Sequence, residues 1–205
     1  MAQNLLQANL NHARQAQDLF VHSLSERGSG LGIAAEPYRV PRENPNWAGD
    51  RGGSVAIHRS PSGGSPSMTP LESGRGYVAV EFAGIAVVGC YVSPNWDLAH
   101  FGGFLAEVGD CVERCAPRPV LIAGDFNAKS RVWGSPRSDA RGETLVDWAA
   151  SLGLCILNTG SEGTCMRRRE ESIVDLTLAS PQPHAWYRGG EWRQGRRRPT
   201  MRTSP

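Results

Sequence analysis

The sequence predicts an α/β (α+β) domain with mixed β-sheets, and three observations support this class. Apolar runs of strand length alternate with segments whose apolar residues recur at helical spacing. Residues 77–82 and 85–92 are joined only by Ala83-Gly84, which predicts a hairpin. The run Pro119–Ala123 (PVLIA) is apolar throughout, as in a strand that is buried on both faces.

In the first half of the chain, short apolar runs lie on both sides of one helical segment. Ala16, Leu19, Phe20 and Leu24 recur at the three- and four-residue spacing of a helix that faces a core. The elements expected here are strands over residues 4–10, 31–35 and 54–58 and a helix over about 12–26.

Two segments of the first half are expected to lack regular structure. Residues 37–53 are rich in Pro, Asn, Arg and Gly, which predicts a long loop. Residues 59–76 (RSPSGGSPSMTPLESGRG) are polar and rich in Pro and Gly. This composition predicts a flexible surface insertion that does not pack.

After the hairpin, helices and strands alternate. Leu98, Phe101, Leu105, Val108 and Val112 share one face of the first expected helix. The elements expected after the hairpin are helices over about 97–115 and 142–152 and strands over 119–123, 154–157 and 173–179.

Composition bounds the classes of protein to consider. The 205 residues are 40% hydrophobic and 20% charged, which suits a globular domain with a buried core and excludes dominant disorder. No apolar run reaches about 18 residues, so we expect no membrane-spanning helix. The N-terminus has no basic region followed by an apolar one, so we expect no secretory signal. These features predict an intracellular protein with no membrane partner.

Polar side chains stand at the ends of four predicted strands, where a core does not require them. Alternation along a strand sends Asp125 and Asn127 to one side and Phe126 to the other. In the last predicted strand, Asp175 points away from its apolar neighbours. Carboxylates beside buried strands suit a hard cation such as Mg²⁺, which takes oxygen ligands. The strand-end residues are Asn9, Asn11, Glu36, Asp125, Asn127 and Asp175.

Each of these positions also has a purely structural explanation. The asparagines after the first strand suit a turn or a helix N-cap, and the glutamate before Pro37 suits a solvated loop. Asp125 suits the start of an Asx turn. A buried unpaired carboxylate is costly, so the alternative for Asp175 is a salt bridge to one of Arg167–Arg169. The positions together are more specific than any one of them.

These motifs resemble the exonuclease–endonuclease–phosphatase superfamily, which includes DNase I-like nucleases and apurinic endonucleases. More narrowly, the chain resembles the endonuclease domain of insect non-long-terminal-repeat retrotransposons. GDFNAKS with an upstream AEPY and a downstream VDLT is the specific part of the match. The resembling stretches, within about residues 3–184, are LLQANLNHARQAQDL (5–19), AAEPY (34–38), YVSPN (91–95), GDFNAKSRVWGS (124–135), Asp139 with Arg141-Gly142, and SIVDLTLAS (172–180).

The resemblance implies a fold and a set of roles. The fold is a four-layer sandwich of two mixed β-sheets packed face to face, with helices outside. Glu36 would hold the divalent metal, Mg²⁺ or Mn²⁺. A metal and hydrogen-bond donors would neutralise the charge that builds on a phosphodiester during in-line attack by water.

The same resemblance assigns catalytic roles to the other strand-end residues. Asp125 would orient and deprotonate the attacking water, and Asn127 would fix Asp125 and the phosphate oxygens. Asn9 would join this hydrogen-bond network, and Tyr91 would contact the scissile phosphate. Asp175 would position a terminal catalytic histidine.

The implied activity is a single-strand nick in duplex DNA that leaves a 3′-hydroxyl to prime reverse transcription. DNA is then the partner and the nucleus the place of action. A reverse transcriptase domain is expected in the intact element but is absent from these 205 residues. The implied DNA contacts are Asn11, Asn95, Lys129, Arg167, Arg168 and Arg169, although a solvated loop is the alternative for the three arginines.

The chain departs from the family after the VDLT strand. Family members carry a Ser-Asp-His segment some tens of residues later, leading into a last core strand, and no Ser-Asp-His occurs in this sequence. Only His184 follows Asp175, with no acid before it and no apolar strand after it. We therefore expect weak or absent catalysis and a missing last strand.

The charge distribution marks the same boundary. Residues 185–205 contain six arginines and one acid, whereas residues 1–184 contain 16 basic and 19 acidic side chains. The tail has no strand or helix period, and Arg, Gly and Pro are what GC-rich DNA yields out of frame. We expect residues 1–184 to form the endonuclease-like domain and 185–205 to be disordered or out of frame, which the other reading frames of the source DNA would test.

Two other functions stay open at this point. The chain could be a non-catalytic nucleic-acid-binding remnant that uses residues 167–169 and the tail. It could also be a phosphatase of the same superfamily, acting on phospholipid or nucleotide phosphates. The GDFNAKS and AEPY motifs argue against the phosphatase.

Overall fold

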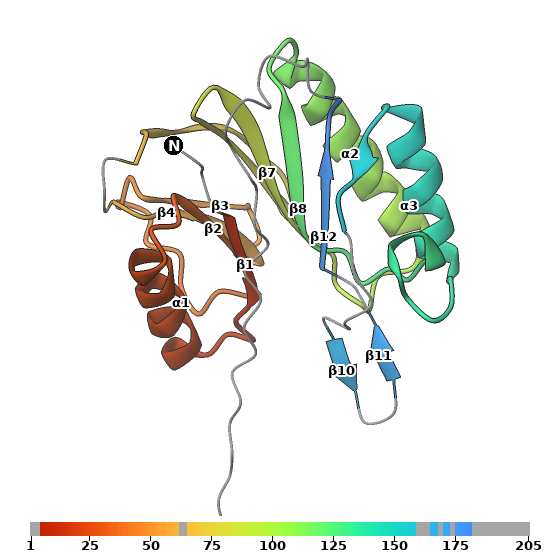
Figure 1. Ribbon diagram of the computed structural model, residues 1–205, viewed down its shortest axis with the longest axis horizontal. Helices are drawn as coiled ribbons and strands as arrows, with labels where there is room; N and C mark the ends of the chain where they lie inside the picture. The colour runs from red at the N-terminus through yellow and green to blue at the C-terminus, as the bar shows by residue number, and fades with distance from the viewer. Residues whose placement is uncertain (1–4, 62–64, 159–164, 168–169, 173–174, 182–205) are drawn as a thin grey trace, which may run out of the picture.

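The computed structural model describes residues 5–61, 65–158, 165–167, 170–172 and 175–181. Two mixed β-sheets pack face to face, with one helix on the outer face of the first sheet and two helices on the outer face of the second (Figure 1). The predicted α/β class and the four-layer sandwich are confirmed.

The first sheet has four strands. They are β1 (Leu5–Asn9), β2 (Leu31–Ala35), β3 (Trp47–Gly49) and β4 (Val55–Arg59). Their order across the sheet is β1-β2-β4-β3. β1 and β2 run parallel, whereas the other two pairs are antiparallel. β2 is buried along its whole length because it lies between two strands and under a helix.

The second sheet has six strands, and a separate hairpin has two. The six are β5 (Met68–Ser73), β6 (Tyr77–Phe82), β7 (Ile85–Tyr91), β8 (Val120–Asp125), β12 (Asp175–Ala179) and β9 (Cys155–Ile156), in that order across the sheet. The hairpin consists of β10 (Cys165–Arg167) and β11 (Glu170–Ser172). Within the described part of this sheet, β7 and β8 run parallel and the other neighbouring pairs are antiparallel. β8 is buried along its length, as its apolar sequence predicts.

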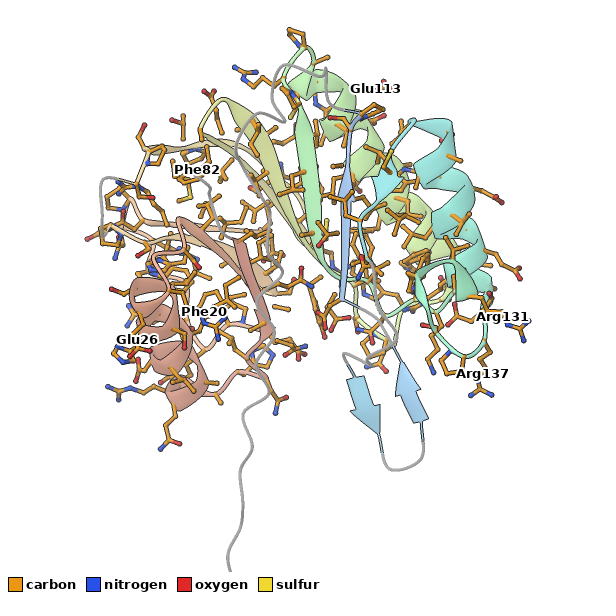
Figure 2. The ribbon with its side chains drawn as sticks, viewed as in Figure 1. Phe20, Glu26, Phe82, Glu113, Arg131 and Arg137 are labelled. Carbon is orange, nitrogen blue, oxygen red and sulfur yellow. The ribbon has the colours of Figure 1, made fainter. Side chains whose placement is uncertain are left out.

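The helices close the outer layers. They are α1 (Arg14–Glu26), α2 (Leu98–Cys115) and α3 (Ala140–Ser151), with a short 3₁₀ turn at Arg131–Trp133. Phe20 and Leu24 of α1 pack on the first sheet, and the labelled Phe20 points from the helix toward it (Figure 2). Phe101 and Leu105 of α2 pack on the second sheet.

A separate core lies between the two sheets. Ile33 and Ile57 of the first sheet meet Val80, Phe82 and Val87 of the second. Because the two sheets share this core, residues that leave the same end of both sheets are held at a fixed separation. The candidate active site uses this arrangement.

The structure corrects several expectations about the elements. The segment 59–76 is not an unpacked insertion, because β5 forms within it and pairs with β6. The loop 37–53 contains β3. Leu19 and Leu98 are exposed rather than on buried faces: Phe20 and Leu24 form the buried face of α1, and Leu98 is the first residue of α2.

No helix in the described part of the chain is long and apolar enough to cross a membrane. Several predictions fall outside the described residues. They concern Arg168, Arg169, His184, the tail 185–205 and residues 173–174 of the last predicted strand.

Candidate active site

Strand ends from both sheets bring the predicted carboxylates to one end of the sandwich. In the second sheet, Asp125 at the end of β8 pairs with Tyr91 at the end of β7 and with Asp175 at the start of β12. In the first sheet, Asn9 ends β1 and pairs with Ala35, which Glu36 follows. The shared core holds these strand ends opposite each other (Figure 1).

Asp125 is the buried centre of this group. Its side chain is 6% exposed, and it receives hydrogen bonds from Asn9 Nδ2 at 3.2 Å and from the Asn127 backbone N–H at 3.1 Å. Burial, and then the nearby Asp175 carboxylate, raise the pKa of Asp125 to about 7, with a further upward contribution from Glu36. The two hydrogen bonds act in the opposite direction. A carboxylate with this pKa can exchange a proton near neutral pH.

Glu36 and Tyr91 meet across the two sheets. The Tyr91 hydroxyl donates a hydrogen bond to Glu36 Oε1 at 2.7 Å, and His12 Nε2 lies 3.9 Å from the same oxygen. Burial, and then the bond to Glu36, raise the pKa of Tyr91. Tyr91 therefore remains a protonated donor at neutral pH. Glu36 is half-buried rather than a fully solvated loop acid.

The Asp175 side chain accepts a hydrogen bond from the first sheet. Gln7 Nε2, in β1, donates a hydrogen bond to Asp175 Oδ1 at 3.0 Å. The Asn158 side chain, just after β9, donates to the Asp175 backbone carbonyl at 2.9 Å and accepts from the Thr177 N–H at 2.8 Å. Gln7 and Asn9 alternate with Ala8 along β1, so both reach toward the carboxylates.

Unusual backbone conformations gather at this end of the sandwich. Among the described residues, five other than glycine have positive φ, and four of them are in this site: Asn11 (47°), His12 (54°), Glu36 (47°) and Asn127 (45°). Each such conformation costs free energy and persists only when surrounding contacts hold it. Such clusters are typical of functional sites.

Arg141 ties together the loops that carry the site. Its guanidinium donates to the backbone carbonyls of Ser93 at 3.2 Å, Pro94 at 3.3 Å and Asn127 at 3.4 Å, and also to that of Trp96. The Asn127 side chain adds a bond to the Val92 carbonyl at 2.9 Å. The loop after β7 and the loop after β8 are thus joined by one planar group.

Replacing Arg141 with lysine should destabilise the chain by about 2–3 kcal/mol, because an ammonium group cannot serve these carbonyls in one plane. Urea denaturation measures the loss. Arg118→Lys is the matched control, since the Arg118 side chain makes an exposed pair with Glu81 at 3.3 Å, and its replacement should change stability by less than about 1 kcal/mol. Equal effects of the two substitutions would contradict the role of Arg141.

The structural alternatives have mixed outcomes. Asn9 and Asn11 are not N-caps, because the N-cap of α1 is Ala13. Asn9 does form a turn, in which Oδ1 accepts the Asn11 N–H at 2.9 Å, and Asp125 forms the Asx turn with Asn127. Strand alternation does not reach Asn127, because β8 ends at Asp125 and Asn127 is left-handed, so the expected shared side of Asp125 and Asn127 stays a prediction. The buried Phe126 does point into the core.

In the described part of the chain, three of the predicted DNA contacts lie in loops that follow the strand ends of the site. Asn11 and Asn95 are exposed, and Lys129 is half-buried two residues after Asn127. Arg167 ends β10, in the hairpin that leads to the start of β12 (Figure 1). Arg131 and Arg137 also project outward, from the loop before α3 (Figure 2).

Sequence reasoning missed three residues of the site. Gln7 lies two positions before Asn9 on a strand, so alternation could have indicated it. Arg141 was part of a matched stretch, but nothing local indicates its four carbonyl partners. Asn158 is a polar strand-end residue like those that were singled out.

The donors present suit a hard divalent cation. Among the described residues, no three or more His, Cys, Asp or Glu side chains form a group that could hold a metal ion. Mg²⁺ needs only one or two carboxylates, because water and substrate phosphate complete its coordination. Glu36 and Asp125 supply carboxylate oxygens at this end of the sandwich, which fits Mg²⁺ or Mn²⁺.

Comparison with solved structures reveals the same fold elsewhere. The endonuclease domain of TRAS1, a telomere-specific non-LTR retrotransposon, matches with a TM-score of 0.68 and 26% identity, over 85% of this chain and 82% of that one. An AP endonuclease from Archaeoglobus fulgidus matches with a TM-score of 0.66 and 15% identity, over 88% and 87%. A 3′ phosphatase from Neisseria, bound to a product DNA hairpin, matches with a TM-score of 0.61 and 16% identity, over 86% of both chains. The last two show the fold alone.

Sequence comparison identifies relatives among mobile elements. The RNA-directed DNA polymerase from the mobile element jockey is 30% identical over 117 residues in Drosophila melanogaster and 28% identical over 156 residues in Drosophila funebris. These matches cover 54% and 73% of this chain but only 12% and 15% of those proteins. The model of the endonuclease-reverse transcriptase family matches residues 85–193, more than half of the chain. The chain therefore belongs to the endonuclease-reverse transcriptase family, and it is a DNase I-like endonuclease domain of the non-LTR retrotransposon type.

Proposed function

We propose that this chain is a Mg²⁺- or Mn²⁺-dependent endonuclease that nicks one strand of duplex DNA. The observation that carries the proposal is the convergence of strand ends from both sheets, where the buried Asp125 carboxylate accepts from Asn9 and lies next to the Tyr91–Glu36 pair. The 3′-hydroxyl at the nick would prime reverse transcription by a reverse transcriptase domain of the intact element, acting in the nucleus. The jockey relatives, which are RNA-directed DNA polymerases, support this assignment.

Each residue of the site has a role in the proposed hydrolysis. Asp125 accepts a proton from the attacking water, and Asn9 and the Asn127 N–H hold its carboxylate in place. The Tyr91 hydroxyl has one hydrogen, which it donates to Glu36 in this structure. When Glu36 holds the metal, this hydroxyl would donate to a phosphate oxygen instead. Glu36 would hold the metal close to the Asp125 charge, and the bound metal would neutralise charge on the phosphate. Asn11, Asn95, Lys129 and Arg167–Arg169 contact the DNA backbone, which positions the duplex.

We further propose that nicking is slow. The Ser-Asp-His segment of the family that this chain resembles does not occur in these 205 residues. The Asp175 carboxylate accepts a hydrogen bond from the Gln7 side-chain amide. Loss of a general acid–base group typically lowers the reaction rate about 10²–10⁴-fold. On the same plasmid, the TRAS1 endonuclease domain should be faster by such a factor, and equal rates would contradict this part of the proposal.

Relaxation of supercoiled plasmid tests the endonuclease assignment. Wild-type chain should nick the plasmid with Mg²⁺ and not with EDTA, and Glu36→Gln should lower the rate at least about 100-fold by weakening metal binding. A polymerase should extend the nick. Glu113→Gln is the matched control, because Glu113 is exposed toward the end of α2 and should change nothing (Figure 2).

Two other outcomes would overturn the assignment. Salt-dependent DNA binding without nicking, unchanged by Glu36→Gln, would identify a non-catalytic binding remnant. Release of inorganic phosphate from nucleotide or phospholipid phosphates, without nicking, would identify a phosphatase.

A further inference from the structure

Asp50 is a buried carboxylate that none of the proposed roles uses. It lies in the turn between β3 and β4 and is 8% exposed. Its Oδ1 accepts from the backbone N–H groups of Ser54 at 2.6 Å and Val55 at 3.0 Å. Its Oδ2 accepts from the Gly52 N–H at 3.0 Å, the Ser54 hydroxyl at 2.9 Å and the Gly76 N–H at 2.9 Å. The burial cost of the charge is offset by four amides and one hydroxyl.

These contacts join the two sheets. Ser54 immediately precedes β4 in the first sheet, and Gly76 immediately precedes β6 in the second. The Arg51 N–H adds a bond to the Gly74 carbonyl at 2.9 Å, so the turn that holds Asp50 is fastened to the loop before β6 at two points. Asp50 thus fixes the first sheet to the second beside their shared core.

Asp50 has two hydrogen-bonded arms, the first through Ser54 and the second through Gly76, and each arm continues to a residue of the candidate active site. In the first sheet, the Ser54 carbonyl accepts the Glu36 N–H at 2.8 Å. In the second, the Gly76 carbonyl accepts the Tyr91 N–H at 2.8 Å. Glu36 and Tyr91 then meet each other through their side chains at 2.7 Å. The five residues form a closed ring of hydrogen bonds that crosses between the sheets twice.

The second arm is also tightly packed. A Cβ placed on Gly76, whose φ is +83°, would lie 2.7 Å from the Tyr91 backbone carbonyl oxygen. The Gly76 and Tyr91 backbones are therefore closely packed as well as hydrogen-bonded, and a side chain at position 76 would not fit between them. A change at Asp50 is transmitted to Tyr91 rather than absorbed between them.

We infer that Asp50 is a positioning residue that sets the separation of Glu36 and Tyr91. It acts on the proposed reaction only through those two residues, so its effect on catalysis rests on the proposed function. Its effect on their backbone contacts does not.

The substitution Asp50→Asn tests this inference because it keeps the shape and removes half of the acceptors. If the amide oxygen faces Ser54 and Val55, its NH₂ group faces the N–H of Gly76 and that arm is lost. If the amide is turned over, the bonds from the Ser54 and Val55 N–H groups are lost, and only the Ser54 hydroxyl still joins the first arm to residue 50. The ring between Glu36 and Tyr91 is therefore broken in one orientation and weakened in the other.

Hydrogen exchange of the Glu36 and Tyr91 amides reports whether the ring is intact, and it does not depend on catalysis. In Asp50→Asn, exchange of the Glu36 or the Tyr91 amide should accelerate at least about tenfold, while the amide of Val87, inside β7, keeps its wild-type rate. Unchanged protection of both amides in a folded variant would overturn the inference. If Asp50→Asn does not fold, Ser54→Ala removes one bond to Asp50 and should accelerate exchange at Glu36 by a few-fold.

Nicking gives the second readout. Asp50→Asn should lower kcat about tenfold and raise the Mg²⁺ concentration for half-maximal rate, with little change in KM for DNA. Glu72→Gln is the matched control: Glu72 accepts bonds from Tyr77 and Arg114, beside the same loop, but does not contact Glu36 or Tyr91. It should leave the Mg²⁺ dependence unchanged.

Hydrogen exchange and nicking together distinguish the positioning role of Asp50 from the proposed endonuclease function. Accelerated exchange in Asp50→Asn, with a wild-type chain that does not nick, would support the ring and contradict the proposed function. A wild-type chain that nicks, with Asp50→Asn identical to it in exchange and Mg²⁺ dependence, would contradict the ring alone.

Discussion

Replacing Asp125 with asparagine is expected to abolish nicking and, in the same variant, to stabilise the fold at pH 8. An amide cannot accept a proton from water, and it offers no charge to a bound cation. The nicking rate should fall by at least about 10³-fold, since general-base catalysis and metal binding are lost together. The plasmid assay with Mg²⁺ measures this.

The gain in stability follows from the raised pKa of Asp125. Its folded-state pKa is about 7, against 3.8 for the unperturbed carboxyl. A raised pKa contributes stability that is fully present below the unfolded-state value and is lost as pH rises through the folded-state value. At pH 8 the folded wild type therefore carries a buried charge that asparagine does not. Asparagine loses one of the two hydrogen bonds that Asp125 accepts, so we expect a net gain of about 1–3 kcal/mol.

The pH dependence separates this cause from a simple change in packing. At pH 5 the Asp125 carboxyl is largely protonated in the folded chain, so the gain from asparagine should be smaller than at pH 8. Urea denaturation in EDTA at both pH values measures it. Adding Mg²⁺ at pH 8 should stabilise wild type more than the variant, because binding stabilises the folded state.

Asp110→Asn is the matched control. Asp110 is exposed on α2, and the substitution makes the same change in net charge. It should leave nicking unchanged and alter stability by less than about 0.5 kcal/mol. If Asp125→Asn keeps more than a tenth of wild-type nicking, Asp125 is not the proton acceptor. If Asp125→Asn is less stable than wild type at pH 8, the buried charge of Asp125 does not destabilise the folded state as inferred.

The sequence predicted the residues of this site better than it predicted their contacts. Asn9, Glu36, Asp125 and Asp175 are polar residues at strand ends, so the pattern alone singles them out. Strand ends of two packed sheets converge, which explains why these residues meet. Asp50 belongs to a glycine-rich turn, and its partner Gly76 is 26 residues away. No local pattern marks such a contact.

The missed strands have a common physical cause. β5 lies at an edge of its sheet, is mostly exposed, contains Pro70 and has an irregular register between Pro70 and Glu72. β3 has three residues and lies at the other sheet's edge. Edge strands need neither continuous apolar character nor a full set of N–H donors. Their composition is therefore that of a loop, and only pairing with a neighbour reveals them.

Replacing Gly124 with alanine is expected to prevent folding or to cost more than about 3 kcal/mol. Gly124 pairs with Cys90 of β7 on one side and Leu176 of β12 on the other. A Cβ at this position would lie 1.9 Å from the Cys90 carbonyl oxygen and 2.6 Å from its carbonyl carbon. Both are backbone atoms of a central strand, so relief requires moving β7 away from β8.

Two further glycines calibrate the expected loss. At Gly32 a Cβ would lie 2.4 Å from Phe20 Cζ and 2.6 Å from Leu24 Cδ1, which are side-chain atoms that can rotate. Gly32→Ala should therefore cost about 1–3 kcal/mol. At Gly103, in α2, nothing lies within 4 Å of the added Cβ, and alanine should stabilise the helix by about 0.5–1 kcal/mol.

A substitution at Gly124 should affect the site as well as stability. The methyl group of alanine would push apart β7 and β8, and these two strands end in Tyr91 and Asp125. If Gly124→Ala yields any folded chain, nicking should be lost in that fraction, whereas folded Gly32→Ala should retain it. Expression, urea denaturation and plasmid nicking of the three variants measure this order. A Gly124→Ala chain as stable as Gly32→Ala and as active as wild type would show that β7 and β8 can separate without cost, and the site would then not depend on their register.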